Sequence, residues 1–382
     1  MIGSRTAHLV SLILTSAAAA SGQAPHPVRV AVGFGVDTLG VPNHDIWALW
    51  RSYVRSRPDS IRPTGSWSHS EQERWPQFDL LSAYVYQGFS HFTVVDLAPA
   101  VGFDSTYLIR TLVSGVSDSV QDVSPLALYR VYAIREDGRW VLANALPRLT
   151  RAWRHATVGR VTFVFPPSRS FSRVRAAQSS AFVDSLAQAF GIVPPRSVDY
   201  YFTDDLMETL RAAGLDFFPL DADTAGGRAL VSDHLVFVGS SSNGEGYRHE
   251  LSHVVLQNAL VGPETAYLVS EGLMTWTGGS AGLDFKSLMP SLKRYLDAHP
   301  ELTLEQLLAD PPRRQGTLDP GYDGLAVVCQ MIYDAKGVPG IRELTGAGRE
   351  PRAVVSAAAR LVGGRPSELD VLWRQRVAQL AR

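Results

Sequence analysis

Two histidines and a glutamate near the middle of the chain have the spacing of a metal site. They are His249, Glu250 and His253, in the order HExxH. On a helix, residues four apart lie one turn apart on the same face, so both imidazoles can reach one ion. Glu250 falls at the edge of that face, where it can hydrogen-bond to a metal-held water and act as general base. The pattern indicates metal-assisted hydrolysis.

This spacing works only on a helix, and the local sequence predicts one. Residues 247–259 contain no proline and no glycine, and Leu251 with residues 254–256 forms an apolar side. Gly262-Pro263 ends the run. We therefore expect the motif to lie on a helix over residues 247–259.

Zinc in a hydrolytic site takes three protein ligands and leaves one position for water. Glu271 is the candidate third ligand, because a turn at Gly262-Pro263 and a returning helix would bring it back to the metal. A metzincin would carry Gly and His where this chain has Leu256 and Ala259. The single cysteine, Cys329, lies within the apolar run LAVVCQMIY, which argues against a thiolate ligand.

The two segments HELSHVVLQ and VSEGLMTWTGG resemble the gluzincins, and within them the peptidase-MA-like superfamily. That family carries HExxH and then an E-G-(hydrophobic)-(small)-x-(aromatic) helix. The match is close over residues 246–280 and looser over residues 156–382. The resemblance implies a strand-bearing upper lobe, an all-helical lower lobe and a substrate cleft between them.

The resemblance also implies roles for individual residues. Zinc (Zn²⁺) would be bound by His249, His253 and Glu271, with Glu250 as general base. Gluzincins usually add a Tyr or His that stabilises the oxyanion of the reaction. Tyr322, at the start of a long expected helix, is the first choice for that donor, and Tyr333 is the alternative.

Two positions depart from related patterns. Thr275 stands where thermolysin-like gluzincins carry an Asp that supports a ligand histidine, so another group, such as a backbone carbonyl, must supply that support. Aminopeptidases of this kind carry a Gly-x-Met-Glu-Asn strand whose Glu grips the substrate amine. The stretch after the expected strand 234–239 is Ser240-Ser241-Ser242-Asn243, without an acid, which argues against an aminopeptidase.

The first 24 residues predict a secretory signal peptide. Arg5 precedes an apolar core over residues 9–14, and small residues follow up to Ala24. That core is too short to cross a bilayer as a helix, so we expect a mature protein without an integral membrane segment. Secretion, or export to a periplasm, follows as the expected location.

The rest of the 382 residues divide into two expected domains of an α+β protein. Residues 25–155 predict one helix, over 44–56, and a curved strand meander with a hairpin around 136–138; this order resembles the nuclear-transport-factor-like cone. Residues 156–382 form the expected catalytic domain. Strands are expected at 158–165, 197–202 and 234–239, with helices at 176–190 and 204–213. Beyond residue 246, helices are expected almost throughout.

The chain carries 36 basic and 37 acidic residues, which excludes the strong basic field of a dedicated nucleic-acid binder. The sequence therefore predicts an exported zinc metallopeptidase that acts on a peptide or protein substrate. The alternative is a non-catalytic ligand- or protein-binding member of the same fold. The role of the N-terminal domain, targeting or inhibition, stays open, as do the oligomeric state and the choice between endo- and exo-cleavage.

Overall fold

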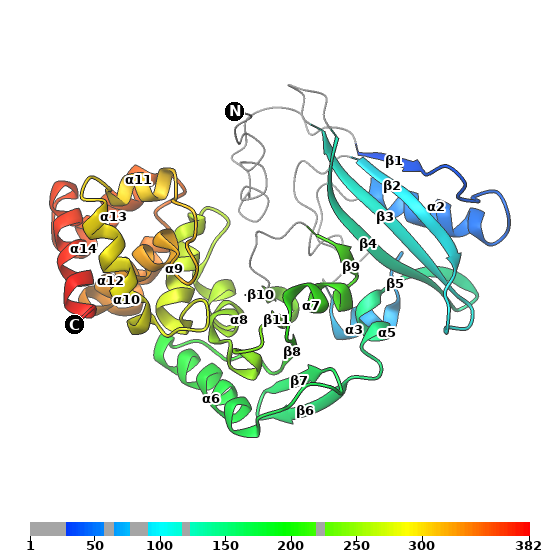
Figure 1. Cartoon of the computed structure of the whole chain (residues 1–382), viewed down its shortest axis with the longest axis horizontal. Coiled ribbons are helices and arrows are strands. Elements are labelled where there is room, and N and C mark those ends of the chain that lie inside the picture. The colour runs from blue at the N-terminus through cyan, green and yellow to red at the C-terminus, as the bar shows by residue number, and fades with distance from the viewer. Residues whose placement is uncertain (1–27, 57–64, 77–90, 117–122, 219–225) are drawn as a thin grey trace. The chain divides into compact units, whose positions relative to one another are not determined.

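The computed structural model describes residues 28–56, 65–76, 91–116, 123–218 and 226–382. The expected signal peptide, residues 1–24, lies outside these ranges. Contacts divide the chain into two compact units. Unit 1 comprises Met1–Arg154, Phe165–Ser168 and Asp205–Thr224, and unit 2 comprises the remainder. The α+β prediction is confirmed by two sheets and a helical C-terminal part (Figure 1).

Unit 1 is built on a strand meander. Its elements are β1 (Arg29–Val32), α2 (Asn43–Arg55), α3 (His69–Arg74), β2 (His91–Pro99), β3 (Thr106–Val116), β4 (Val123–Glu136), β5 (Arg139–Asn144), α5 (Ala145–Leu149), α7 (Leu206–Ala213) and β9 (Leu215–Phe217). The sheet order is β1-β2-β3-β4-β5, antiparallel from β2 to β5, with β1 parallel to β2. The expected helix and hairpin are both present.

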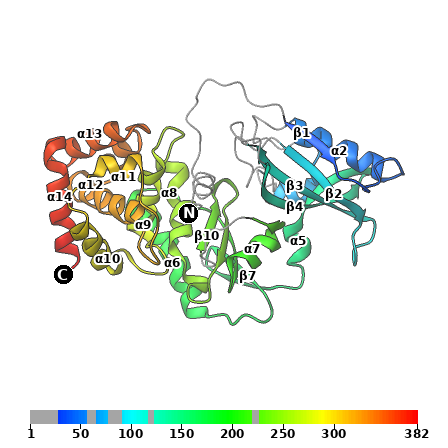
Figure 2. The same ribbon diagram turned by 45° about the horizontal axis from the view of Figure 1, so that its top comes forward.

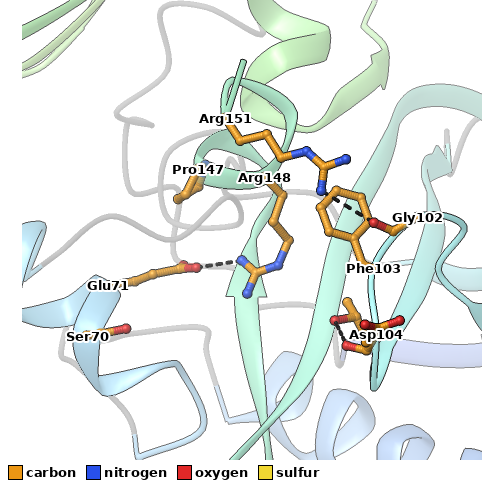
Figure 3. Close-up of a pocket in the computed structure, with 9 residues that line it drawn as sticks. Ser70, Glu71, Gly102, Phe103, Asp104, Pro147, Arg148 and Arg151 are labelled. Carbon is orange, nitrogen blue, oxygen red and sulfur yellow. Dashed lines mark hydrogen bonds and ion pairs between the residues drawn. The ribbon is translucent and has the colours of Figure 1, made fainter. Parts of the chain in front are cut away.

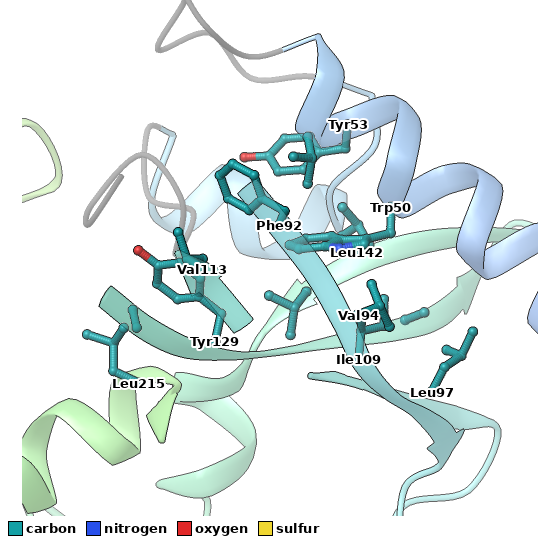
Figure 4. Close-up of a cluster of buried hydrophobic side chains, with 14 of the residues drawn as sticks. Trp50, Tyr53, Phe92, Val94, Leu97, Ile109, Val113, Tyr129, Leu142 and Leu215 are labelled. Carbon is teal, nitrogen blue, oxygen red and sulfur yellow. The ribbon is translucent and has the colours of Figure 1, made fainter. Parts of the chain in front are cut away.

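The core of unit 1 lies between α2 and the sheet (Figure 4). Ile46, Trp50 and Tyr53 recur at helical spacing on α2 and are buried. They pack against alternate strand residues such as Val94 and Ile109, because successive side chains of a strand point to opposite faces. Trp47, next to Ile46 on the same helix, is only half-buried.

One strand of unit 1 comes from far along the chain. β9 pairs with β4, with Leu128 opposite Phe217 and Tyr129 opposite Leu215. The sequence placed this segment in the second domain, whereas the contacts group residues 205–224 with unit 1. The boundary near residue 155 stays a prediction.

Unit 2 begins with a second sheet. Its first elements are β6 (Arg154–Val158), β7 (Val161–Phe165), α6 (Arg173–Phe190), β8 (Val198–Thr203), β10 (Gly226–Leu230), η1 (Val231–Asp233), β11 (Leu235–Gly239) and η2 (Gly244–Gly246). The order is β10-β11-β8-β7-β6, so β10 is an edge strand, antiparallel to β11. The strand expected over 158–165 is confirmed over residues 161–165 as β7, but the chain turns at residues 159–160 and residue 158 ends a separate strand, β6. Neither β9 nor β10 was expected.

Helices make up the rest of unit 2, as expected (Figure 2). They are α8 (Arg248–Leu260), α9 (Tyr267–Gly278), α10 (Phe285–Ala298), α11 (Leu304–Ala309), α12 (Pro320–Thr345, kinked at Gly337), α13 (Pro351–Leu361) and α14 (Pro366–Leu380). Within the described ranges, no helix is both long enough and apolar enough to cross a membrane.

Candidate metal centre

The HExxH segment lies on α8, as the sequence predicts. His249 and His253 are one turn apart and buried, with ring centroids 5.1 Å apart. Most of this helix is buried, including Leu251, Val255 and Leu256 on the side that packs into unit 2. Burial on several sides fixes the rotation of α8, and with it the direction in which the two imidazoles point.

The second helix of the site, α9, brings Glu271 to the two histidines. Its Oε2 lies 3.2 Å from Nε2 of His249 and 3.6 Å from Nε2 of His253. Gly272, the next residue, lets α12 approach closely, because a Cβ at that position would lie 2.5 Å from the Cβ of Leu325. The close packing of α9 on α12 therefore requires a glycine at position 272, directly after Glu271.

Nδ1 of each imidazole, the ring nitrogen that points away from Glu271, makes a hydrogen bond to a protein oxygen. Nδ1 of His249 donates to the carbonyl oxygen of Gly279 at 2.8 Å, and Nδ1 of His253 donates to Oε1 of Gln257 at 2.7 Å. Because these acceptors require a proton on Nδ1, they leave Nε2 as the ligand atom of each ring.

The support expected to replace the missing Asp is thus a backbone carbonyl for His249 and a side-chain amide for His253. Thr275, at the Asp position, is buried, and its Oγ1 has no partner among the described residues. The sequence reasoning missed Gln257. Its signal was the four-residue spacing from His253, which places both on one helix face.

Glu250 is buried beside the two histidines and lies against β10. A Cβ on Gly227 would fall 2.6 Å from Cγ of Glu250, so only glycine leaves room there. The strand that lies beside Glu250 is β10, earlier in the chain than the stretch 240–243 that the sequence comparison used. β10 reads Gly-Gly-Arg-Ala-Leu and carries no carboxylate.

Two tyrosines stand beside the cluster. Tyr322 lies at the start of α12, where Asp319 caps the helix by accepting from its N–H at 3.0 Å. Its ring is parallel to that of His249, with an interplanar angle of 3° and centroids 6.2 Å apart. Its hydroxyl is hydrogen-bonded to that of Tyr267, which lies one turn before Glu271 on α9. The sequence analysis did not include Tyr267 in the site, although its position four residues before Glu271 places both on one face of a helix.

The alternative tyrosine lies elsewhere. Tyr333 packs against Phe190 and Trp276, with centroids 5.6 Å and 4.9 Å away. These contacts place the half-buried ring of Tyr333 in an aromatic group with Phe190 and Trp276. Cys329 is fully buried, and burial raises the pKa of its thiol to about 12, which disfavours a thiolate.

Burial and mutual attraction set the protonation of the site. Burial acts to raise the pKa of Glu271, but His253 and His249 outweigh it and hold that pKa far below its usual value. Burial raises the pKa of Glu250, although the two histidines lower it in part. Burial, with the charge of Glu271, also raises the pKa values of Tyr322 and Tyr267 well above normal, so both hydroxyls keep their protons at neutral pH.

The geometry fits a metal ion. One ligand atom each from His249, His253 and Glu271 lie within 4.8 Å of one another, and all three residues are buried. Two imidazole nitrogens and one carboxylate oxygen, with the outer nitrogens already bonded, are a donor set typical of catalytic zinc. Within the described residues, this is the cluster of His, Cys, Asp and Glu that has such geometry.

Of three comparisons with known proteins, only the one with solved structures gives matches. No family model matches the sequence. No curated protein matches it. Among solved structures, it is similar to an M1 zinc metallopeptidase from Deinococcus radiodurans, at 12% identity and a TM-score of 0.25. A mutant of that peptidase bound to a Tyr-Ser-Ala substrate gives 13% identity and a TM-score of 0.28. Each match covers 76% of this chain but only 63% of the other chain, and at such TM-scores the likeness carries no argument about activity.

Proposed function

We propose that this chain is a zinc-dependent peptidase, with its metal held by His249, His253 and Glu271. The observation that carries the proposal is the buried cluster of three ligand atoms within 4.8 Å, supported from outside by Gly279 and Gln257. Zinc bound there supplies a Lewis acid and lowers the pKa of a water molecule towards about 7.

Glu250 supplies the general base. It lies next to His249 in sequence but outside the ligand set, so its carboxylate stays available for protons. A pKa raised by burial makes it a stronger proton acceptor than an exposed glutamate. Glu250 takes a proton from the attacking water as the water adds to the scissile carbonyl, and then gives that proton to the leaving amine.

The tyrosine pair supplies hydrogen bonding for the oxyanion. Tyr322 and Tyr267 are both protonated donors beside the ligand cluster. Because each hydroxyl has one proton and the two are bonded to each other, one proton stays free when Tyr267 donates to Tyr322. Tyr322 then directs its own proton to the substrate carbonyl oxygen, where negative charge develops.

We extend the proposal to location and substrate. The layout of residues 1–24 supports export, and the absence of a carboxylate on β10 supports cleavage away from a free N-terminus. A peptide or protein is the proposed substrate. Unit 1 is proposed as an accessory module.

The test is a peptide-library digest with mass-spectrometric readout, run beside metal analysis of the purified chain. We expect about one zinc per chain and cleavage that a chelator abolishes. Glu250→Gln should keep the zinc and lose cleavage, whereas Glu305→Gln, an exposed glutamate on α11, should behave as wild type. Bound zinc without cleavage would favour the binding-protein alternative. Absence of zinc would overturn the proposed metal site, and normal cleavage by Glu250→Gln would overturn the mechanism.

A further inference from the structure

Unit 1 contains a cavity of about 620 Å³ that the proposed peptidase chemistry does not use (Figure 3). Its walls come from α3, from the turn between β2 and β3, and from α5 with the residues just after it. This volume is in the range of pockets that hold small molecules. Two arginines, Arg148 and Arg151, extend into it (Figure 3).

Arg148 is held in place by the hydrogen bonds of one nitrogen, and its guanidinium also lies over the ring of Tyr132, 5.7 Å from the centroid. Its Nη1 donates to Oε1 of Glu71 at 2.8 Å and to the carbonyl oxygen of Asn144 at 3.1 Å. Glu71 is itself fixed, because its Oε2 accepts from the backbone and side-chain nitrogens of Asn144. Among the described residues, Nε and Nη2 of Arg148 have no hydrogen-bond partner, so these donors remain for a ligand.

Arg151, three residues further along the same wall, is held in a similar way against the turn between β2 and β3. Its guanidinium lies over the ring of Phe103, 4.5 Å from the centroid, and its Nη1 donates to the carbonyl oxygen of Gly102 at 3.3 Å. Cation–π contact with a ring restricts the side chain without using its in-plane donors. Both guanidinium groups are therefore positioned before any ligand arrives.

The charges at the cavity favour a singly charged anion. Both oxygens of Glu71 already accept hydrogen bonds, one from Asn144 and one from Arg148. The Arg148–Glu71 pair therefore carries no net charge. Asp104, exposed at the rim, adds a negative charge that opposes a dianion such as phosphate. The planar donor edge of an arginine matches the two oxygens of a carboxylate.

We propose that this cavity in unit 1 binds a small ligand through its carboxylate group, which Arg148 and Arg151 hold together. Phe103 and Pro147 supply apolar surface for the part of the ligand next to the carboxylate. This site is independent of the metal centre, because every lining residue belongs to unit 1.

The test measures binding to the full chain by saturation-transfer NMR, after chelator treatment so that a metal-bound carboxylate does not contribute. The observed probes are N-acetylalanine and its amide N-acetylalaninamide, and inorganic phosphate, which has no carbon-bound proton, is added as a competitor of N-acetylalanine. We expect saturable binding of N-acetylalanine and none of the amide. Equal binding of acid and amide, no binding of either, or tighter binding of phosphate would overturn the proposal.

A matched pair of variants locates the site. Arg151→Gln should weaken N-acetylalanine binding at least about tenfold, because it removes a charge-assisted hydrogen bond. Arg135→Gln is the control, since Arg135 also lies 4.5 Å over a ring, that of Trp140, and donates to the carbonyl of Gly138, but lies outside the cavity. Circular dichroism checks that both variants fold. Equal affinity for the two variants would place the site elsewhere and refute the assignment.

Discussion

His253 and Gln257 are joined within a single turn of α8, where Nδ1 of the imidazole donates to Oε1 of the amide at 2.7 Å. Gln257 therefore sets the tautomer and the ring orientation of a proposed zinc ligand without touching the metal itself.

Gln257→Met should weaken zinc binding about 10- to 100-fold, since it removes this acceptor but keeps a helix-forming side chain of similar length. Competition with a fluorescent chelator measures the affinity. Gln257→Glu, which keeps the acceptor, is the control and should bind zinc at least as well as wild type. Equal zinc affinity for Gln257→Met and wild type would show that the hydrogen bond has no such role.

Tyr322→Phe should lower kcat by about 100-fold, because it removes a hydrogen bond that strengthens as charge develops. Tyr267→Phe should lower kcat less, about tenfold, with KM unchanged, since Tyr267 acts by orienting Tyr322. Tyr333→Phe is the control, since the ring of Tyr333 packs against Phe190 and Trp276. The assignment fails if Tyr333→Phe lowers kcat as strongly as Tyr322→Phe.

Gly227→Ala should lower kcat about 10- to 100-fold and leave zinc bound, because the added Cβ displaces Glu250 from the edge of β10. Steady-state kinetics and metal analysis measure the two effects. Gly246→Ala is the matched control, since a Cβ at Gly246 meets no atom within 4 Å. Full activity of Gly227→Ala would mean that Glu250 has freedom to move away from β10.

Glu245→Ala should destabilise unit 2 by about 2 kcal/mol, because the N–H of Ser172 loses its buried acceptor and Arg175 loses its ion-pair partner. Glu245 is fully buried, accepts from the N–H of Ser172 at 2.6 Å and lies 2.6 Å from Nη2 of Arg175. Urea unfolding measures the change in free energy, with Glu305→Ala as the exposed control. A loss no larger than that of the control would contradict this reading of the α6–η2 connection.

The parts of the site that lie on single helices could be predicted from the sequence. His249, Glu250 and His253 follow from one helical period, and Glu271 follows from the next helix after a turn signal. Gln257 lies four residues after His253, and Tyr267 lies four residues before Glu271. The same helical spacing would therefore have placed both residues beside the proposed ligands. The stacking of Tyr322 on His249 depends on how α12 packs against α9, which no local pattern encodes.

The strands were harder to predict where they are short or glycine-rich. β10 contains Gly226-Gly227 and no alternation of apolar and polar residues, so it lacks the strand signal. β9 has three residues and owes its extended form to pairing with β4. Propensity cannot report such a pairing, because the partner lies far away in sequence.

The pairing of β9 with β4 also bears on the order in which the chain folds. During synthesis the sheet of unit 1 stays incomplete until residue 217 has left the ribosome, and by then β6, β7, α6 and β8 of unit 2 have already emerged. A single cut near residue 155 would leave β4 with an uncovered edge in one fragment and β9 without a partner in the other, and unpaired strand edges promote aggregation. The two halves are therefore best expressed as one chain. For the same reason, a circular permutant opened between α7 and β9 should aggregate more readily than one opened at a surface turn of unit 2.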